Sequence, residues 1–183
     1  LKAGCKEIWI TSNDTGAYMV EQGGKQKLVE LMDNILSVPM DFKARIGMMN
    51  PGNTITMLDE LIEIYKHPKM FKFLHIPVQS GNNDILKAMN RRYSAEDFIK
   101  IAEAFRKEIP NITISTDIII GFPSETEGQF LDSLRLIEKT EPDIVNTSRY
   151  AAREGTIAAK MKQLTITELK RRAKLMMELH RKI

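Results

Sequence analysis

The clearest structural signal in the chain is Leu74-His-Ile-Pro-Val-Gln-Ser-Gly-Asn-Asn-Asp-Ile-Leu-Lys-Ala-Met89. An apolar strand pattern runs into Gln79-Ser80-Gly81, and the residues that follow open a helix. The stretch Thr116-Asp-Ile-Ile-Ile-Gly-Phe-Pro-Ser-Glu125 repeats this plan. In α/β proteins the binding residues gather at the carboxyl ends of the strands. Both stretches therefore predict site residues where a strand ends.

Short β-rich runs alternate with longer helical patterns along the rest of the chain. The predicted strands are Lys6–Ser12, Ala44–Asn50, Phe71–Val78, Thr113–Ile120 and Asp143–Tyr150. The predicted helices are Lys25–Ser37, Thr56–His67, Asn83–Met89, Ala95–Lys107 and Glu125–Lys139. Three pairs predict N-terminal helix caps, namely Thr56 with Asp59, Ser94 with Asp97 and Ser124 with Glu127. Alternation without hairpin turns predicts parallel strands joined by right-handed crossovers.

The predicted strands carry more polar residues than a doubly wound sheet usually has. His75 and Gln79 share one face of their strand, and Leu74 and Ile76 share the other. A partly polar wall that faces a cavity, with apolar residues toward the helices, favours an open barrel over a flat sheet. A doubly wound nucleotide-binding domain is disfavoured because no glycine-rich first turn is present.

The composition limits the size of the fold and the classes of protein to which the chain can belong. A chain of 183 residues with 43% hydrophobic content is enough for one domain with its own core. The sequence contains no run of about 18 apolar residues, so it predicts no membrane span. The single cysteine, Cys5, excludes an internal disulfide and fits a reducing cytoplasm, and it cannot by itself hold an iron–sulfur cluster. The formal charge of +3 is compatible with a nucleic-acid partner.

Candidate site residues follow the first two strands. Thr11, Ser12 and Asn13 are small polar residues that could hydrogen-bond the amino or carboxylate group of a cofactor, although a simple turn explains them equally well. Arg45 lies within a predicted strand, where an arginine is unusual unless it points into a polar interior. A role in the site and a purely structural role both stay open for these residues.

The third and fourth strands supply the stronger candidates. Gln79 offers a donor and an acceptor, Ser80 adds a hydroxyl, and the glycine that follows allows close backbone approach. Asp117 lies in an apolar strand and therefore needs a cationic or hydrogen-bonding partner. Ile119 offers an apolar surface for a purine ring, and Gly121 begins a turn toward a helix whose amino end could face a ligand.

The chain from Lys160 onward has a different character. Thr165 and Glu168 predict the start of a helix that carries six basic residues, namely Lys170, Arg171, Arg172, Lys174, Arg181 and Lys182. This helix is either an ordinary solvated helix or a basic surface beside an RNA. We expect a barrel over residues 1–160 and, over residues 161–183, a basic helix that leads to a further RNA-binding domain.

Several blocks together resemble the radical S-adenosylmethionine methylthiotransferases. They are Gly4-Cys-Lys-Glu-Ile-Trp-Ile-Thr11, Asn13-Asp-Thr-Gly-Ala-Tyr18, His75-Ile-Pro-Val-Gln-Ser-Gly81 and Thr116-Asp-Ile-Ile-Ile-Gly-Phe-Pro123. Asp14–Tyr18 and Gly47–Pro51 are similar to the archaeal and eukaryotic branch, which acts on N6-threonylcarbamoyladenosine in tRNA. Met19 and Ser124 stand where the family usually has glycine.

The resemblance implies a partial (β/α)6 radical-SAM barrel of which units two to six are present, with parallel strands and outer helices. It implies S-adenosylmethionine and [4Fe-4S] clusters as cofactors, with cluster ligands that would precede Leu1, so this chain alone is expected to be inactive. The family's cofactor contacts would fall on Thr11, Ser12 and Asn13, on Gln79 and Ser80, and on Ile118 to Gly121. No residue here is assigned as catalytic or as a metal ligand.

Other functions stay open from the sequence alone. Within the class, the substrate could be isopentenyl-adenosine in tRNA or a ribosomal protein. Outside it, the chain could be a non-catalytic RNA-binding barrel.

Overall fold

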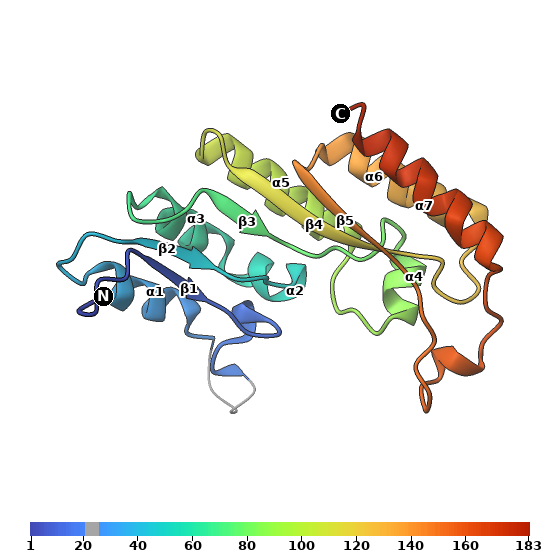
Figure 1. The fold of residues 1–183 in the computed structure, drawn as a ribbon, viewed down its shortest axis with the longest axis horizontal. Coiled ribbons are helices and arrows are strands. Elements are labelled where there is room, and N and C mark those ends of the chain that lie inside the picture. The colour runs from blue at the N-terminus through green and yellow to red at the C-terminus, as the bar shows by residue number, and fades with distance from the viewer. Residues whose placement is uncertain (21–25) are drawn as a thin grey trace. The chain divides into compact units, whose positions relative to one another are not determined.

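The computed structural model describes residues 1–20 and 26–183, and these fold into two compact units (Figure 1). The first unit contains Leu1–Pro77 and Lys100–Ile114, and the second contains Val78–Ile99 and Ser115–Ile183. Helix α5 (Ala95–Glu108) and strand β4 (Thr113–Ile120) each contribute residues to both units.

In the first unit, neighbouring strands follow the order of the chain. Strand β1 (Glu7–Ile10) pairs in parallel with β2 (Lys43–Ile46), with Trp9 opposite Arg45. Strand β3 (Phe73–His75) lies beside β2, because the His75 carbonyl accepts a 3.0 Å hydrogen bond from the N–H group of Met49. The pairing of β1 with β2 confirms the parallel arrangement predicted for the first two strands.

The helices of the first unit bury the apolar face of these strands. They are α1 (Leu28–Leu36), the short α2 (Pro51–Thr54), a 3-10 turn (Ile55–Met57), α3 (Leu58–Lys66) and the later part of α5. Leu28 and Leu61 are fully buried, and Tyr65 meets Phe105 edge to face with 5.2 Å between ring centroids. Burial raises the pKa of the Tyr65 hydroxyl above its ordinary value. Helices α1, α3 and α5 are amphipathic, and their apolar sides form the core.

The second unit is built on β4 and β5 (Ile144–Arg149). These strands are parallel, with a register that runs from Ser115 opposite Ile144 to Ile120 opposite Arg149. The helices are α4 (Asn83–Ala88), α6 (Glu127–Thr140) and α7 (Ile166–His180), and a 3-10 turn covers Ala158–Lys160. Helix α7 packs against both α6 and β5 (Figure 1).

The predicted alternation of polar and apolar faces is confirmed by burial. Leu74, Ile76 and Val78 are fully buried, whereas His75 and Gln79 keep part of their surface exposed. The same pattern continues on β4, where Ile118 is buried and its neighbours Asp117 and Ile119 are half-buried. One face of these strands therefore forms core, and the other is available to a ligand.

Every predicted strand and helix is present, and most differences lie at the ends. Strand β4 has the bounds that the sequence predicts, and β3 is shorter at both ends. The predicted helix start at Lys25 lies outside the described residues, and α1 begins at Leu28. The predicted division at residue 160 stays a prediction.

Two predicted helix caps are wrong. Thr56 falls in the 3-10 turn before α3, where its hydroxyl donates to the Asn53 carbonyl at 2.8 Å instead of capping a helix. Helix α6 is capped by Thr126 together with Gln129, because Ser124 is still in the preceding loop. The cap at Ser94 is confirmed, since the N–H group of Asp97 donates to the Ser94 hydroxyl at 3.2 Å.

No helix in the described part of the chain is long and apolar enough to cross a membrane.

Candidate cofactor-binding site

The loop after β1 is held in place by Asp14. Its carboxylate accepts hydrogen bonds from the backbone of Gly16 at 3.1 Å, from the backbone of Asn50 at 3.1 Å and from the side-chain amide of Asn53 at 2.7 Å. The loops that follow β1 and β2 are therefore tied together. The predicted site residues Thr11, Ser12 and Asn13 are exposed and lie directly before this anchor.

The sequence alone predicts a possible turn in this segment and does not predict the anchoring role of Asp14. A usable signal was present, because an aspartate two residues before a glycine often accepts a hydrogen bond from the backbone. The partners at Asn50 and Asn53 are 36 and 39 residues away in sequence and could not be inferred locally.

Arg45 lies on β2 between two aromatic rings. Its guanidinium carbon is 4.9 Å from the ring centre of Trp9 on β1 and 3.9 Å from that of Phe73 on β3. The residue is half-buried, and a polar interior around it stays a prediction. A cofactor contact by Arg45 stays a prediction.

Gln79 has an unusual backbone conformation, with φ of 72°. Its N–H group donates to the Asp117 carbonyl at 2.8 Å, and its own carbonyl accepts from Ile119 at 2.9 Å. A residue other than glycine is rarely stable in this left-handed region. Such strain is found most often at functional sites, where the surrounding structure holds it in place.

A pocket of about 640 Å³ opens beside Gln79. It is lined by Gln79, Arg91, Asp117, Ile118, Ile119, Asn146, Ser148, Arg149, Tyr150, Ala151, Arg153, Thr156 and Ala158. The predicted residues Gln79, Asp117 and Ile119 thus come together on one wall. The hydrogen-bonding partner predicted for Asp117 is confirmed, because the Asn146 side chain donates to its carboxylate at 2.8 Å.

Ser80 and Gly81 do not line this pocket and instead fix the loop against α6. The Ser80 side chain is fully buried 3.4 Å from the Ser133 hydroxyl, which also accepts from the Gly81 N–H group at 2.8 Å. A Cβ atom added at Gly81 would lie 2.5 Å from the Asp132 carbonyl oxygen. Position 81 therefore needs glycine for close packing, and the predicted cofactor contact of Ser80 stays a prediction.

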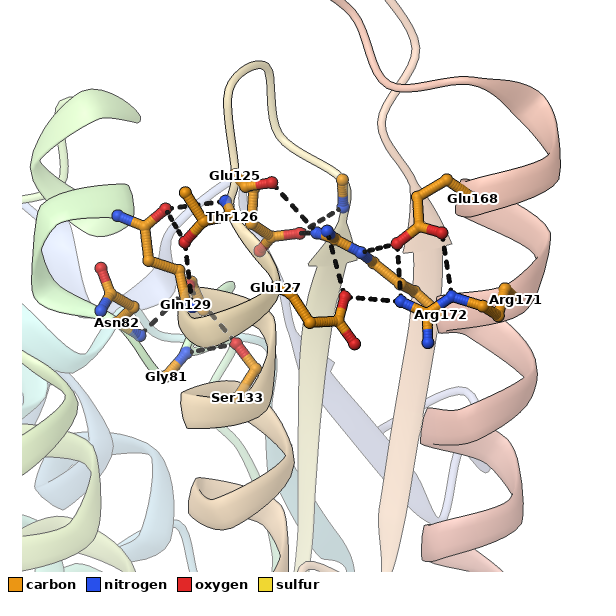
Figure 2. A network of polar contacts seen from close by, with 12 residues as sticks. Gly81, Asn82, Glu125, Thr126, Glu127, Gln129, Ser133, Glu168, Arg171 and Arg172 are labelled. Atoms are coloured by element: carbon orange, nitrogen blue, oxygen red, sulfur yellow. Dashed lines mark hydrogen bonds and ion pairs between the residues drawn. The ribbon is translucent and has the colours of Figure 1, made fainter.

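Gly121 follows β4 with φ of 72° and bonds to a buried polar network that includes Glu125 and Arg172, both labelled in Figure 2. Its N–H group donates to the Glu125 carboxylate at 3.0 Å, and the same carboxylate accepts from the Arg172 guanidinium at 2.8 Å. The exposed fractions of these two side chains are 1% for Glu125 and 5% for Arg172. Burial raises the pKa of Glu125, while the bonds from Gly121 and Arg172 act to lower it.

Two further carboxylates complete the network around Arg172. Glu168 accepts from its Nε atom at 2.7 Å, and Glu127 lies 3.3 Å from its Nη2 atom. Neighbouring Arg171 also pairs with Glu168, at 2.7 Å (Figure 2). The network fastens the loop after β4 to α7. Two arginines of the basic helix are therefore occupied by carboxylates.

Parallel strands with a pocket at their carboxyl-terminal halves define a ligand-binding α/β fold of the barrel type. Residues 1–137 match the Radical SAM superfamily, and the chain belongs to that superfamily. Solved structures support the fold. Coproporphyrinogen III oxidase (HemN) from Escherichia coli has a TM-score of 0.67 at 21% identity over 87% of this chain and 37% of its own. The Methanocaldococcus infernus Elp3 protein has a TM-score of 0.62 at 18% identity over 97% of this chain and 45% of its own. The predicted partial radical-SAM barrel is thereby confirmed.

Curated relatives are more similar in sequence. The probable threonylcarbamoyladenosine tRNA methylthiotransferase of Pyrococcus horikoshii is 49% identical over 96% of this chain and 41% of its own length. That of Archaeoglobus fulgidus is 48% identical over 100% of this chain and 43% of its own. The Drosophila melanogaster threonylcarbamoyladenosine tRNA methylthiotransferase is 39% identical over 96% of this chain and 32% of its own. The chain thus spans less than half the length of these relatives.

Proposed function

We propose that the complete gene product is a radical S-adenosylmethionine methylthiotransferase that acts on N6-threonylcarbamoyladenosine in tRNA. One observation carries this proposal: archaeal and insect relatives named for this activity are 39% to 49% identical over at least 96% of the chain. Membership of the Radical SAM superfamily agrees with the chemistry that the name implies.

The pocket beside Gln79 has the chemistry to hold part of S-adenosylmethionine. The Gln79 amide and the Asp117 carboxylate offer hydrogen-bonding groups to ribose hydroxyls, and Ile119 offers an apolar surface to a purine. The backbone bonds of Gln79 to Asp117 and Ile119 hold this wall together. When bound, the cofactor supplies the radical and the methyl group for methylthio transfer.

The residues of this chain do not fit an iron–sulfur cluster. The sequence has one cysteine, Cys5, which is exposed, and no group of three or more possible metal ligands occurs in the described part of the chain. A cluster needs several thiolate ligands. No step that depends on a cluster is therefore assigned to residues of this chain.

The charge around the pocket supports an RNA partner. Arg91, Arg149 and Arg153 line it, and arginine binds phosphate through several hydrogen bonds. These residues lie beside the groups that we assign to the cofactor. A tRNA held there would bring a nucleotide close to Gln79 and Asp117. With a tRNA substrate, a cytoplasmic location is part of the same proposal.

The proposal is tested on tRNA from cells that lack the gene. Mass spectrometry of digested tRNA should show loss of the methylthio form of N6-threonylcarbamoyladenosine, with its precursor retained. The wild-type gene should restore the modified nucleoside, and a variant with Asp117→Asn should restore less of it. A matched control is Asp143→Asn, at an exposed aspartate outside the pocket.

Other outcomes would contradict the proposal in distinct ways. Loss of the methylthio form of isopentenyl-adenosine, or of a methylthio group from a ribosomal protein, would assign the chain to another branch. If every methylthio product persists, a non-catalytic RNA-binding barrel is the better explanation.

A further inference from the structure

A row of side chains crosses the partly exposed face of the first unit. Trp9 on β1 lies opposite Arg45 on β2 in the strand register, and Phe73 on β3 follows on the other side. The guanidinium carbon of Arg45 is within 4.9 Å of the Trp9 ring centre and 3.9 Å of the Phe73 ring centre. We call Trp9, Arg45 and Phe73 the aromatic–arginine row.

The Arg45 guanidinium has rings for neighbours but no anion. Over residues 1–20 and 26–183, the structure contains no hydrogen bond or ion pair from this group. Contact with ring faces holds the guanidinium in place and reduces its hydration. The N–H donors of a guanidinium lie in its plane, so ring contact leaves them available to a planar anion such as a carboxylate.

Trp9 is the solvent-exposed member of the aromatic–arginine row. Trp9 is 59% exposed, although it lies within a strand and its ring contacts the Arg45 guanidinium. A large exposed aromatic ring next to an unpaired cation offers a planar group a surface to pack against. The row therefore fits a ligand that joins a flat part to a carboxylate.

We propose that the aromatic–arginine row binds the carboxylate of the threonylcarbamoyl group of the substrate. This inference rests on the proposed function and adds to it the residue that recognises the modification. Arg45 pairs with the carboxylate, and Trp9 packs against the flat urea group that joins the amino acid to the base. Unmodified adenosine has no carboxylate and leaves Arg45 without a partner.

Charge indicates that the carboxylate bound by Arg45 comes from the substrate and not from the cofactor. The methionine end of S-adenosylmethionine carries an ammonium group and a sulfonium beside its carboxylate, so Arg45 would meet two positive charges near one negative charge. The threonylcarbamoyl nitrogen is part of a urea and is uncharged. Its carboxylate is the net anion that an arginine without an acidic neighbour attracts.

The test measures RNA binding by the complete gene product, with the numbering of this chain. Two anticodon stem-loops are compared by fluorescence anisotropy, one with N6-threonylcarbamoyladenosine and one with adenosine. Wild-type protein should prefer the modified RNA, and Arg45→Gln should reduce that preference about 10-fold or more, the size expected for a charged hydrogen bond. Affinity for S-adenosylmethionine, measured separately by calorimetry, should stay unchanged.

Two further variants serve as controls. Lys43→Gln removes a positive charge from the same face of β2 but leaves the row intact, and it should keep the preference. Arg45→Lys keeps the charge without the planar donor set, and it should show an intermediate preference with a melting temperature near that of the wild type.

The contrary results are distinguishable. If Arg45→Gln keeps the wild-type preference, the inference is wrong and the proposed function stands. If it weakens S-adenosylmethionine binding while the preference survives, the carboxylate belongs to the cofactor. If wild-type protein shows no preference, the proposed substrate and the inference both fail.

Discussion

Single residues in the left-handed backbone region mark where the chain accepts strain. Gln79, Ser124 and Met19 have φ angles of 72°, 66° and 70°. The family resemblance identified Met19 and Ser124 as replacements for glycine, and the structure gives the physical reason why glycine suits both positions. Gln79 differs, because its side chain lines the pocket.

Replacing Ser124 by glycine should raise the free energy of unfolding by about 1 kcal/mol, because the left-handed conformation costs a residue with a Cβ atom roughly that amount. For a chain of this size the melting temperature should rise by about 2–4 °C. Differential scanning calorimetry provides the measurement. Ser124→Ala is the control, and an equal gain from alanine would show that the hydroxyl, not the backbone, carries the cost.

Residue-level prediction succeeded where the signal was local. The need of Asp117 for a polar partner and the alternation around His75 and Gln79 follow from neighbours in the sequence, whereas the partner itself, Asn146, is 29 residues away. Ser80 looked like a ligand contact because it stands between Gln79 and Gly81. Its hydroxyl lies against Ser133, which is 53 residues away and invisible to any local pattern.

At the scale of an element, helix α7 is the clearest case. Its start at Thr165 was predictable, because the hydroxyl accepts from the Glu168 N–H group at 3.2 Å as a capping pattern requires. Its buried arginine was not predictable. Arg172 looked like any other basic residue of the helix, and only contact with Glu125 on another segment buries it.

Arg172→Met should lower the free energy of unfolding by about 3–5 kcal/mol, because it leaves the buried Glu125 carboxylate without its cation. Arg171→Met is the matched control. Arg171 is the neighbouring residue and pairs with the same Glu168, but its side chain is exposed, so its loss should lower the free energy of unfolding far less than the loss of Arg172. Urea titration measures both variants.

The double variant Glu125→Gln with Arg172→Met is a second test of the buried ion pair. Removing the carboxylate charge as well should recover much of the loss. Equal losses in the Arg172 and Arg171 single variants, or no recovery in the double variant, would show that the buried pair is not the cause.

Stability should depend on pH through Glu168. Its hydrogen bonds to Arg171 and Arg172 lower its pKa to about 2, so the group stabilises the fold above its ordinary pKa of 4.5, and that contribution is lost as the pH falls toward 2. Glu168→Gln should therefore melt below the wild type at pH 7, with a difference that shrinks between about pH 5 and pH 2. The raised pKa of Glu125 acts in the opposite direction, so the comparison with the variant is essential.

A constant difference between wild type and Glu168→Gln from pH 7 to pH 2 would contradict this assignment. Thermal melts in buffers of equal ionic strength are the measurement, because exposed ion pairs weaken with salt.

At the scale of the whole molecule, the sequence predicts the parallel strands, and the family resemblance adds the partial barrel with outer helices. Strand–helix alternation has few solutions, and chirality reduces them further. The two incorrect caps arose because several polar residues near each helix start could serve, and tertiary contacts choose among them. The pocket could not be predicted from local sequence, because its lining combines β4, β5 and loops that are far apart along the chain.

Cys5 should have no part in holding iron in the complete gene product. It is exposed and belongs to no cluster of possible metal ligands in the described residues. After reconstitution, Cys5→Ser should keep the wild-type iron content and the absorbance of the iron–sulfur chromophore. A fall in bound iron by a quarter or more would make Cys5 a ligand.

The tie between Glu125 and Arg172 also constrains how related sequences can diverge. A substitution of only one partner leaves an unpaired charge in the protein interior and destabilises the fold. A change at one position is therefore disfavoured unless the other position changes as well. We expect the two positions to be inherited as a pair: both kept, or both exchanged for uncharged side chains of similar volume.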